Sequence, residues 1–220
     1  MKRIIAALAM CVVASAAQAS VVVQNTLYTK SDENSWLSSG FGRSTWISQS
    51  FTPGVSGRLD RIDLQIGAIG SDDLRVHFGS GEAIEGTYSE LFAIDIAAAG
   101  VPAGLGGLFS LDLSGEGLML SAGSLYSVIL SSTITGGGNP FQWVIGERNA
   151  AGDEFSVPPY AGGKAFASVN QGLTWSSRGV DRPLRTWMTA AVPEPATWAF
   201  MIVGFGLVGA AARRQRIAQA

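Results

Sequence analysis

The sequence predicts an all-β fold for residues 20–191, a jelly-roll-like β-sandwich. Short runs of aliphatic, aromatic and threonine residues alternate with polar ones, which is the two-residue period of a half-buried strand. Turn-forming residues separate these runs, and 28 of the 220 residues are glycine, well above the usual share of about 7%. No part of this region has a long apolar period of 3.6 residues, which excludes a helical domain.

The individual strands follow from this alternation. Residues 59–66 place Ile62, Leu64 and Ile66 on one face, with polar side chains between them, and residues 74–78 alternate in the same way. In chain order, the expected strands cover residues 21–29, 45–51, 59–66, 74–78, 91–96, 108–113, 117–120, 125–130, 141–145, 164–169 and 184–190. Segments rich in Gly and Pro at 52–54, 100–107, 136–140 and 157–159 provide turns between them. Short strands joined in this way are typical of a sandwich.

The N-terminal segment, residues 1–19, has the three parts of a secretory signal peptide. Lys2 and Arg3 give a positive start, residues 4–17 are largely apolar, and residues 17–19 form a small-x-small cleavage site. The apolar stretch is shorter than the roughly 20 residues that span a membrane. The segment is therefore expected to direct export and then to be removed.

Signal peptidase is expected to cleave between Ala19 and Ser20. The alternative is a lipoprotein acylated at Cys11, but Met10 then occupies a position where a small residue is expected. Cys11 is the only cysteine, so a domain that begins at Ser20 has no disulfide. Burial and sheet hydrogen bonds must hold it together.

Charge excludes one class of partner for the domain at 20–191. It holds ten basic and 16 acidic residues, because five of the 15 basic residues lie in the two terminal segments. A nucleic-acid-binding protein needs a basic face to neutralise phosphates. No nucleic-acid partner is therefore expected.

The C-terminal segment, residues 192–220, has the composition of a membrane anchor. Residues 196–212 carry no charge, and as a helix they would extend about 25 Å, enough for a thin bilayer core. Trp198 lies near the start of this stretch, as interfacial aromatics do. The basic tail at 213–216, with Arg213, Arg214 and Arg216, would stay on the cytoplasmic side. The segment predicts a transmembrane helix at 196–212.

The order of features in this segment resembles a PEP-CTERM sorting signal of the PEPxxWA type. Its motif occupies residues 193–199, with Pro193, Glu194, Pro195, Trp198 and Ala199, and an apolar helix and an arginine cluster follow. The resemblance implies that an exosortase, an integral-membrane cysteine transpeptidase, recognises the motif and processes the chain nearby. It also implies a Gram-negative bacterium that makes exopolysaccharide, with an inner-membrane intermediate that then reaches the cell surface or the outside. An ordinary C-terminal anchor is the alternative.

The middle of the chain resembles secreted bacterial sandwich domains of the choice-of-anchor kind. The resemblance rests on residues 49–52, 57–64, 118–126 and 160–165. It implies a sandwich fold and no particular chemistry.

Candidate catalytic residues are few. His77 is the only histidine, and the alternation of its strand places it on the outward, solvent-facing side. The sequence contains three carboxylate pairs of the kind that glycoside hydrolysis uses, namely Asp60 with Asp63, Asp72 with Asp73, and Glu82 with Glu85. Asp72 and Asp73 also fit an ordinary turn. We expect no catalytic site.

The binding candidates are aromatic and oxygen-rich side chains. Trp36 and Trp175 lie in stretches rich in Ser, Gly and Asn, so they are candidates for stacking against a sugar ring, whereas Trp143 and Trp187 lie in alternating strands and are expected in the core. The alternative is that every tryptophan of the domain packs in the core or its rim. No cofactor is expected, although residues 32–34 and 72–73 have the oxygen ligands for a structural Ca²⁺.

These observations predict a non-enzymatic exported surface or extracellular-matrix protein, sorted through its C-terminal motif and associated with exopolysaccharide. Its expected partners are signal peptidase, an exosortase, the membrane before processing, and polysaccharide. A carbohydrate-binding module that uses loop aromatics is one alternative, and a secreted enzyme similar to glycoside hydrolases is the other.

Overall fold

The computed structural model describes residues 20–25, 27, 35–84, 87–133, 138–148, 154–156, 160–191 and 202–208. The chain divides into two units, one of residues 19–190 and one of residues 1–18 and 191–220. The first unit contains all the described strands and corresponds to the predicted domain at 20–191. The predicted signal peptide at 1–19 lies outside the described residues.

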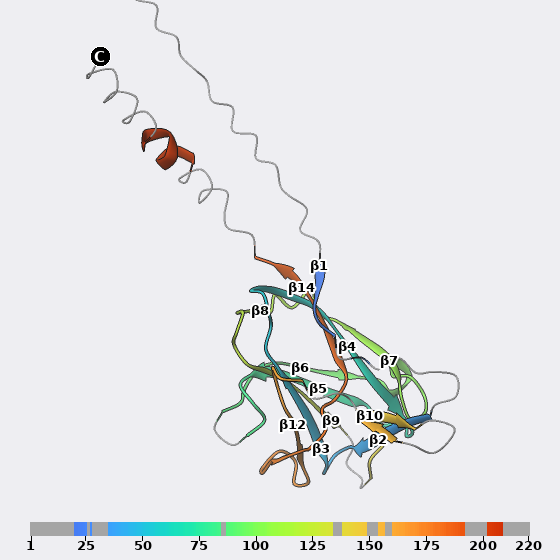
Figure 1. Cartoon of the computed structure of the whole chain (residues 1–220). Coiled ribbons are helices and arrows are strands. Elements are labelled where there is room, and N and C mark those ends of the chain that lie inside the picture. Colours follow the sequence, from blue (N-terminus) through green and yellow to red (C-terminus); the bar gives the residue numbers. More distant parts are fainter. Residues whose placement is uncertain are drawn as a thin grey trace, which may run out of the picture. The chain divides into compact units, whose positions relative to one another are not determined.

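Two antiparallel sheets face each other in the domain, which confirms the all-β sandwich (Figure 1). Within the described residues the larger sheet has eight strands. Five of them follow one another in the order β1 (Ser20–Asn25), β14 (Leu184–Ala190), β4 (Gly57–Ala68), β10 (Phe141–Arg148) and β11 (Glu154–Ser156). The other three are β2 (Ser35–Phe41), which pairs with β10, and β7 (Gly107–Asp112) and β8 (Met119–Leu120), which both pair with β4. The smaller sheet has six: β13 (Ser176–Ser177), β12 (Ala165–Ser168), β3 (Trp46–Phe51), β9 (Tyr126–Ser132), β5 (Leu74–Ser80) and β6 (Ser89–Ile96). A single turn of 3₁₀ helix, η1 (Ala98–Gly100), follows β6.

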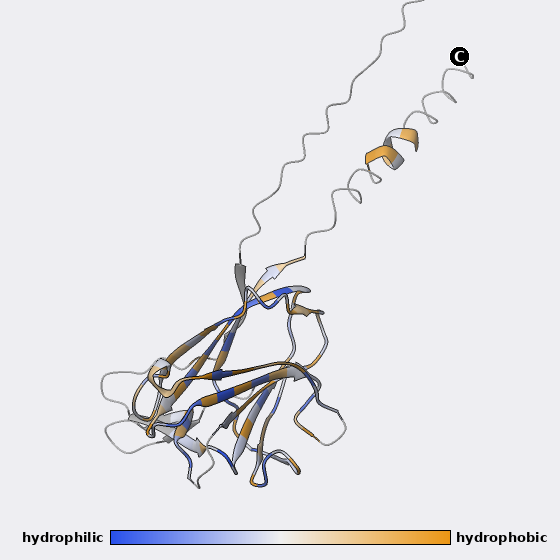
Figure 2. Ribbon diagram, turned by 180° about the vertical axis from the view of Figure 1, so that it is seen from behind, coloured by the Kyte–Doolittle hydropathy of each residue, from blue (hydrophilic) through white to orange (hydrophobic). Residues whose placement is uncertain are grey.

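Apolar side chains from both sheets form the core between them. Figure 2 shows the alternation of apolar and polar positions along the strands. The largest fully buried side chains are aromatic: Trp143, Phe41, Phe51, Phe78 and Phe141. The rings of Phe41 and Phe141 stack with their centroids 5.5 Å apart across the β2–β10 pair. The sequence prediction that Trp143 is a core residue is therefore confirmed.

A β-bulge in β4 decides which side chains reach the outer face of the larger sheet. Trp187 of β14 pairs with Arg61, and the next residue, Met188, pairs with Leu59, so Asp60 is one extra residue in β4. A bulge of this kind shifts the phase of the alternation. Leu59 therefore points into the core, as residues 62, 64 and 66 do, while Asp60 and Arg61 both reach the outer face.

The second unit is described at residue 191 and at residues 202–208, and the latter form a short helix. The large apolar side chains of this helix are all more than half exposed: Ile202, Val203, Phe205, Leu207 and Val208. The rest of the transmembrane helix predicted at 196–212 lies outside the described residues. In the part of the chain that the structure describes, no helix has the length and apolar character needed to cross a membrane.

Candidate functional site

A groove on the outer face of the larger sheet is the candidate binding site. Its volume is about 520 Å³, and its lining residues are Asp60, Arg61, Asp112, Ser114 and Trp187. They come from β4, β14 and the end of β7 with the turn after it, so segments far apart in the sequence build one surface. The bulge at Asp60 makes the groove charged, because it brings two successive charged residues of β4 to the same face.

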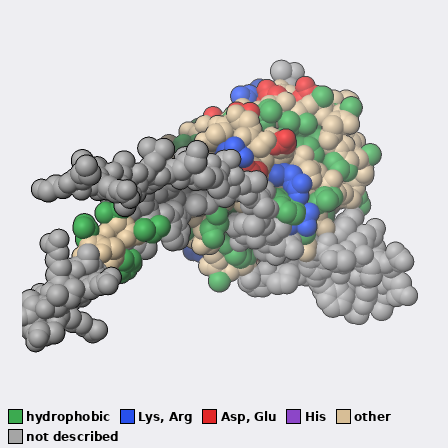
Figure 3. Space-filling model, turned by 90° about the horizontal axis from the view of Figure 1, so that it is seen from above, with side chains coloured by type: hydrophobic (Ala, Val, Ile, Leu, Met, Phe, Trp, Pro, Cys, Tyr) green, Lys and Arg blue, Asp and Glu red, His purple; other side chains and the backbone are tan. Residues whose placement is uncertain are grey.

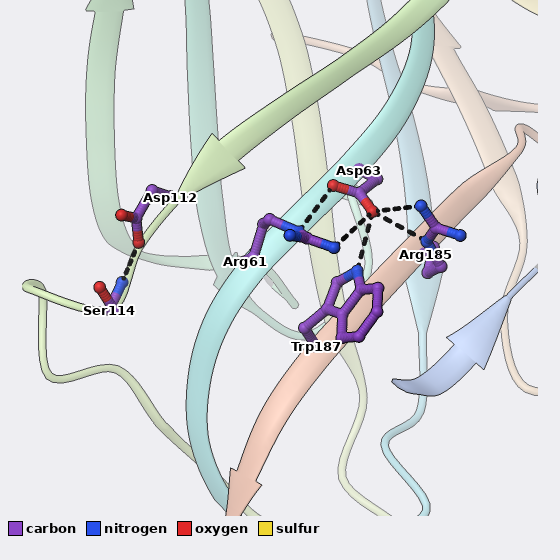
Figure 4. A network of polar contacts seen from close by, with 6 residues as sticks. All are labelled: Arg61, Asp63, Asp112, Ser114, Arg185 and Trp187. Atoms are coloured by element: carbon purple, nitrogen blue, oxygen red, sulfur yellow. Dashed lines mark hydrogen bonds and ion pairs between the residues drawn. The ribbon is translucent and has the colours of Figure 1, made fainter. Parts of the chain in front are cut away.

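Asp63 is the buried anchor of this surface, with an exposed fraction of 0% (Figure 4). Its Oδ2 atom accepts a hydrogen bond of 2.8 Å from Nε of Arg185 and another of 2.8 Å from Nε1 of Trp187. A second nitrogen of Arg185, Nη2, also lies 2.8 Å from Oδ2. One carboxylate thus joins β14 to β4 through two side chains of β14.

Arg61 completes the ion-pair network from the other side of Asp63. Its Nη2 atom donates to Oδ2 at 3.4 Å, a long hydrogen bond. Its Nε atom lies 3.0 Å from Oδ1, which is an ion-pair distance, but the two atoms miss the angles of a hydrogen bond and neither has another partner. The contact between Arg61 Nε and Asp63 Oδ1 is therefore a charge interaction without a hydrogen bond. The guanidinium also lies over the indole of Trp187, 4.1 Å from the ring centroid, and Arg185 lies 5.3 Å from it.

The environment keeps the Asp63 carboxylate ionised. Burial, the largest single effect, raises the pKa of this carboxyl. Hydrogen bonds from Trp187, Ser110 and Arg185 lower the pKa, and so does the positive charge of Arg61. Together these interactions outweigh burial, so the pKa lies below its ordinary value.

Two carboxylates at the edge of the groove, the buried Asp60 and the exposed Asp112, are held by hydrogen bonds. Asp60 is held by Nε of Arg58 at 2.8 Å and by the hydroxyl of Thr189 at 2.7 Å. Asp112 accepts the backbone N–H of Ser114 at 2.9 Å. This hydrogen bond is the main reason why the pKa of Asp112 lies below its ordinary value, and the carboxylate is fully exposed.

The sequence interpretation missed this site because it assigned Trp187 to the core. That assignment is wrong: Trp187 is partly exposed and lies on the outer face beside Arg61 and Asp63. The alternation in β14 does place Leu184, Thr186 and Met188 inside. The sequence signal that was available is the same alternation counted from Leu184, which puts Arg185 and Trp187 on the opposite face.

His77 lies on the outer face of the smaller sheet, as predicted, but it is not solvent-facing: only 8% of it is exposed. Trp46 covers it, with the two rings stacked at a centroid distance of 5.0 Å. Its Nδ1 atom lies 2.6 Å from Glu90 Oε2, and its Nε2 atom lies 3.1 Å from the Ser131 hydroxyl. Ser131, His77 and Glu90 are thus linked in the same order as the residues of a hydrolase triad. However, Ser131 is only 1% exposed, so a substrate cannot reach the hydroxyl in this structure.

The two predicted sugar-stacking residues do not come together. Trp175 precedes β13 of the smaller sheet and is partly buried, packed like Trp46 and Tyr88 against a buried cluster of Ala83, Ile129 and Phe166. The backbone of Trp36 lies in β2 of the larger sheet, not in a loop, and its side chain lies outside the described residues.

The other sequence candidates have ordinary structural surroundings or fall outside the described part. Asp73 accepts the backbone N–H of Ala98 at 3.3 Å, at the start of η1. Glu85 and the proposed Ca²⁺ segment at 32–34 lie outside the described residues. Among the residues that the structure describes, no group of three His, Cys, Asp or Glu residues is placed to hold a metal ion.

The C-terminal segment begins where the domain ends. β14 finishes at Ala190, and residues 191–216 match the family model of the PEP-CTERM protein-sorting motif. This range contains the predicted motif at 193–199, the apolar stretch and the basic tail. No curated protein and no solved structure matches the chain. The protein thus carries a PEP-CTERM protein-sorting motif, the signal of a surface protein sorted by an exosortase.

Proposed function

We propose that this protein is a non-enzymatic component of the cell surface or extracellular matrix of a Gram-negative bacterium, associated with exopolysaccharide and delivered by exosortase processing. The observation that carries the proposal is the sorting motif at residues 191–216, whose matched range begins at the residue after the last strand of the domain. A compact domain with its own core thus stands directly before a processing signal.

Two further observations support this route, one for its membrane-anchored stage and one for removal of the N-terminal segment. The helical residues 202–208 expose large apolar side chains, with Phe205 73% exposed, and a lipid environment would cover them. The first strand of the domain begins at Ser20, the residue that follows the proposed signal peptidase bond. Ser20 also pairs with Thr189 of β14, so the first and last strands of the domain are neighbours.

The non-enzymatic assignment is supported by the chemistry of the groove. A glycoside hydrolase needs a general acid, which is a carboxyl group whose pKa is raised. The pKa values of Asp63 and Asp112 are both lowered, which is the opposite of that requirement. Asp60 and Asp63 are also engaged with arginines, so this predicted catalytic pair is better explained as part of an ion-pair network.

The sorting route is tested by a variant of the motif. Glu194→Ala combined with Trp198→Ala should leave the protein in the membrane fraction, whereas the wild type should appear in the surface or extracellular fraction. Both fractions are measured by immunoblotting in a host with an active exosortase and in the same host without it. Surface delivery of the double variant at the wild-type level would contradict the proposal. A matched control is Gln219→Ala, which changes the tail outside residues 191–216.

A further inference from the structure

The groove around Trp187 lies in the domain, outside the sorting motif at residues 191–216, and its features are those of a binding site. It is concave, and its side chains converge from three strands and a turn. Its volume of about 520 Å³ lies within the range of about 300–1,000 Å³ that is common for small-molecule sites. Its floor is rigid, because the buried Asp63 fixes Arg185 and Trp187 by hydrogen bonds of 2.8 Å. Rigid support of this kind lowers the entropy cost of binding.

The charges in and around the groove nearly cancel. Arg58 pairs with Asp60 at 2.8 Å, and Asp63 lies between Arg61 and Arg185. In the space-filling view, acidic and basic side chains are both present on the surface, without one sign dominating (Figure 3).

Asp112 completes the balance of charge around the groove. Its carboxylate is exposed and is held by the backbone of Ser114, and among the described residues it forms no ion pair. With it, three carboxylates balance the three arginines, because Asp63 is shared by Arg61 and Arg185. These described residues therefore offer no net positive charge to attract an acidic ligand, which favours an uncharged, hydrogen-bonding one.

The chemistry of the lining indicates which uncharged ligand fits. Trp187 is partly exposed, and although Arg61 lies over its ring, the part of the indole that lines the groove suits the apolar C–H face of a sugar ring. The Asp112 carboxylate accepts hydrogen bonds from hydroxyl groups, and the Ser114 hydroxyl both donates and accepts them. We propose that this groove binds a neutral saccharide, which stacks against Trp187 and donates hydroxyl hydrogen bonds to Asp112.

The proposal rests on the proposed exopolysaccharide association for its biological setting, and it names the surface and the ligand class. It also moves saccharide recognition away from Trp175, which lies beside the other sheet. Trp175 packs against a cluster that contains the buried Ile129 and Phe166, as Trp46 and Tyr88 also do.

Affinity gel electrophoresis of the full chain tests the proposal. The protein is solubilised in a detergent without a sugar headgroup, so that the detergent does not compete. The gels contain neutral dextran, galactomannan or β-glucan, or the acidic polymer alginate as the comparison. We expect at least one neutral polymer to retard the wild type and alginate to have no effect.

Four variants locate the binding surface. Trp187→Ala and Asp112→Asn should each weaken the apparent affinity about tenfold or more, through loss of stacking and of charge-assisted hydrogen bonds respectively. Asp112→Asn changes an exposed side chain, so it tests the groove without unfolding the domain. The matched controls are Trp175→Ala and Asp95→Asn, an exposed carboxylate of the smaller sheet. Both should bind like the wild type.

The possible failures are distinguishable. Retardation of the wild type together with equal retardation of Trp187→Ala and Asp112→Asn would overturn the groove assignment and leave the polysaccharide association intact. Loss of binding in Trp175→Ala alone would move the site to the other sheet. Retardation by alginate only would overturn the neutral class, and retardation by no polymer would overturn both the groove and the association.

Discussion

Replacing Asp63 by asparagine tests the ion-pair network most sharply. The substitution keeps the shape of the side chain and removes the charge on which Arg61, Arg185 and Trp187 depend. Removing one partner of a buried ion pair costs about 3–5 kcal/mol. Here the arginine side chains remain 39% and 24% exposed, so water compensates part of that loss. We expect the free energy of unfolding to fall by about 2–4 kcal/mol.

The assay is urea unfolding of residues 20–190, the compact unit, followed by tryptophan fluorescence and circular dichroism. For a domain of this size, a loss of 2–4 kcal/mol lowers the midpoint of thermal unfolding by roughly 5–15 °C. Asp112→Asn is the control, since surface substitutions of this kind stay within about 0.5 kcal/mol. A free energy of unfolding for Asp63→Asn within about 0.5 kcal/mol of the wild-type value would show that the ion-pair network does not stabilise the domain.

The same network has a defined pH dependence. The pKa of Asp63 is lower in the folded domain than in the unfolded chain, so the unfolded chain takes up a proton first as the pH falls. The stabilisation is therefore complete above the ordinary carboxyl pKa of about 4 and is lost as the pH falls through the lower folded value. The stability difference between wild type and Asp63→Asn should shrink over that acidic window. A difference that stays constant down to the acid transition would contradict the assignment.

Three further substitutions probe other parts of the fold, each measured by urea unfolding of the same domain. Leu64→Ala should cost about 2–5 kcal/mol, because Leu64 is fully buried and the substitution leaves a cavity; a cost below 1 kcal/mol would mean that the core is loosely packed. Tyr88→Phe should leave stability unchanged or raise it slightly, because the buried Tyr88 hydroxyl has no hydrogen-bond partner among the described residues. A clear loss of stability would reveal a partner. The pKa of Tyr88 should also lie above its ordinary value in a spectrophotometric titration, first through burial and then through the charge of Glu90. Gly57→Ala should lower stability by more than about 1 kcal/mol, because its Cβ would meet the backbone carbonyl of Thr189, and a neutral result would show that β4 and β14 separate easily there.

The strands with a clear alternation were predictable from sequence, and those without it were not. Residues 184–190 were expected as a strand and form β14 with the same bounds. β2 has Ser38, Ser39 and Gly40 in its middle, so it lacks the apolar period that marks a half-buried strand. β11 and β13, with three and two residues, are too short to show any period.

The candidate groove could not be predicted, because its contacts are long-range. Asp63 and Arg185 are 122 positions apart in the chain, and only the pairing of β4 with β14 brings them together. The bulge at Asp60 also changes the phase of the alternation, which a strictly two-residue period does not anticipate. His77 illustrates the same limit: its outward direction follows from sequence, whereas its cover by Trp46 depends on a neighbouring element.

The sorting motif needed no tertiary structure to be found, since it is a continuous pattern of residues. Pro193 to Ala199, the apolar stretch and the arginines stand in sequence order, and residues 191–216 match the family model. The domain before it has no such linear signature, so its ligand has to be inferred from the folded surface.

The intact mass of the protein recovered from the cell surface reports on the processing of both terminal segments. The account predicts a chain that begins at Ser20 and lacks the basic tail at 213–216, because both terminal segments have been processed. A delivered protein whose mass includes Arg213, Arg214 and Arg216 would contradict exosortase processing and favour an ordinary membrane anchor.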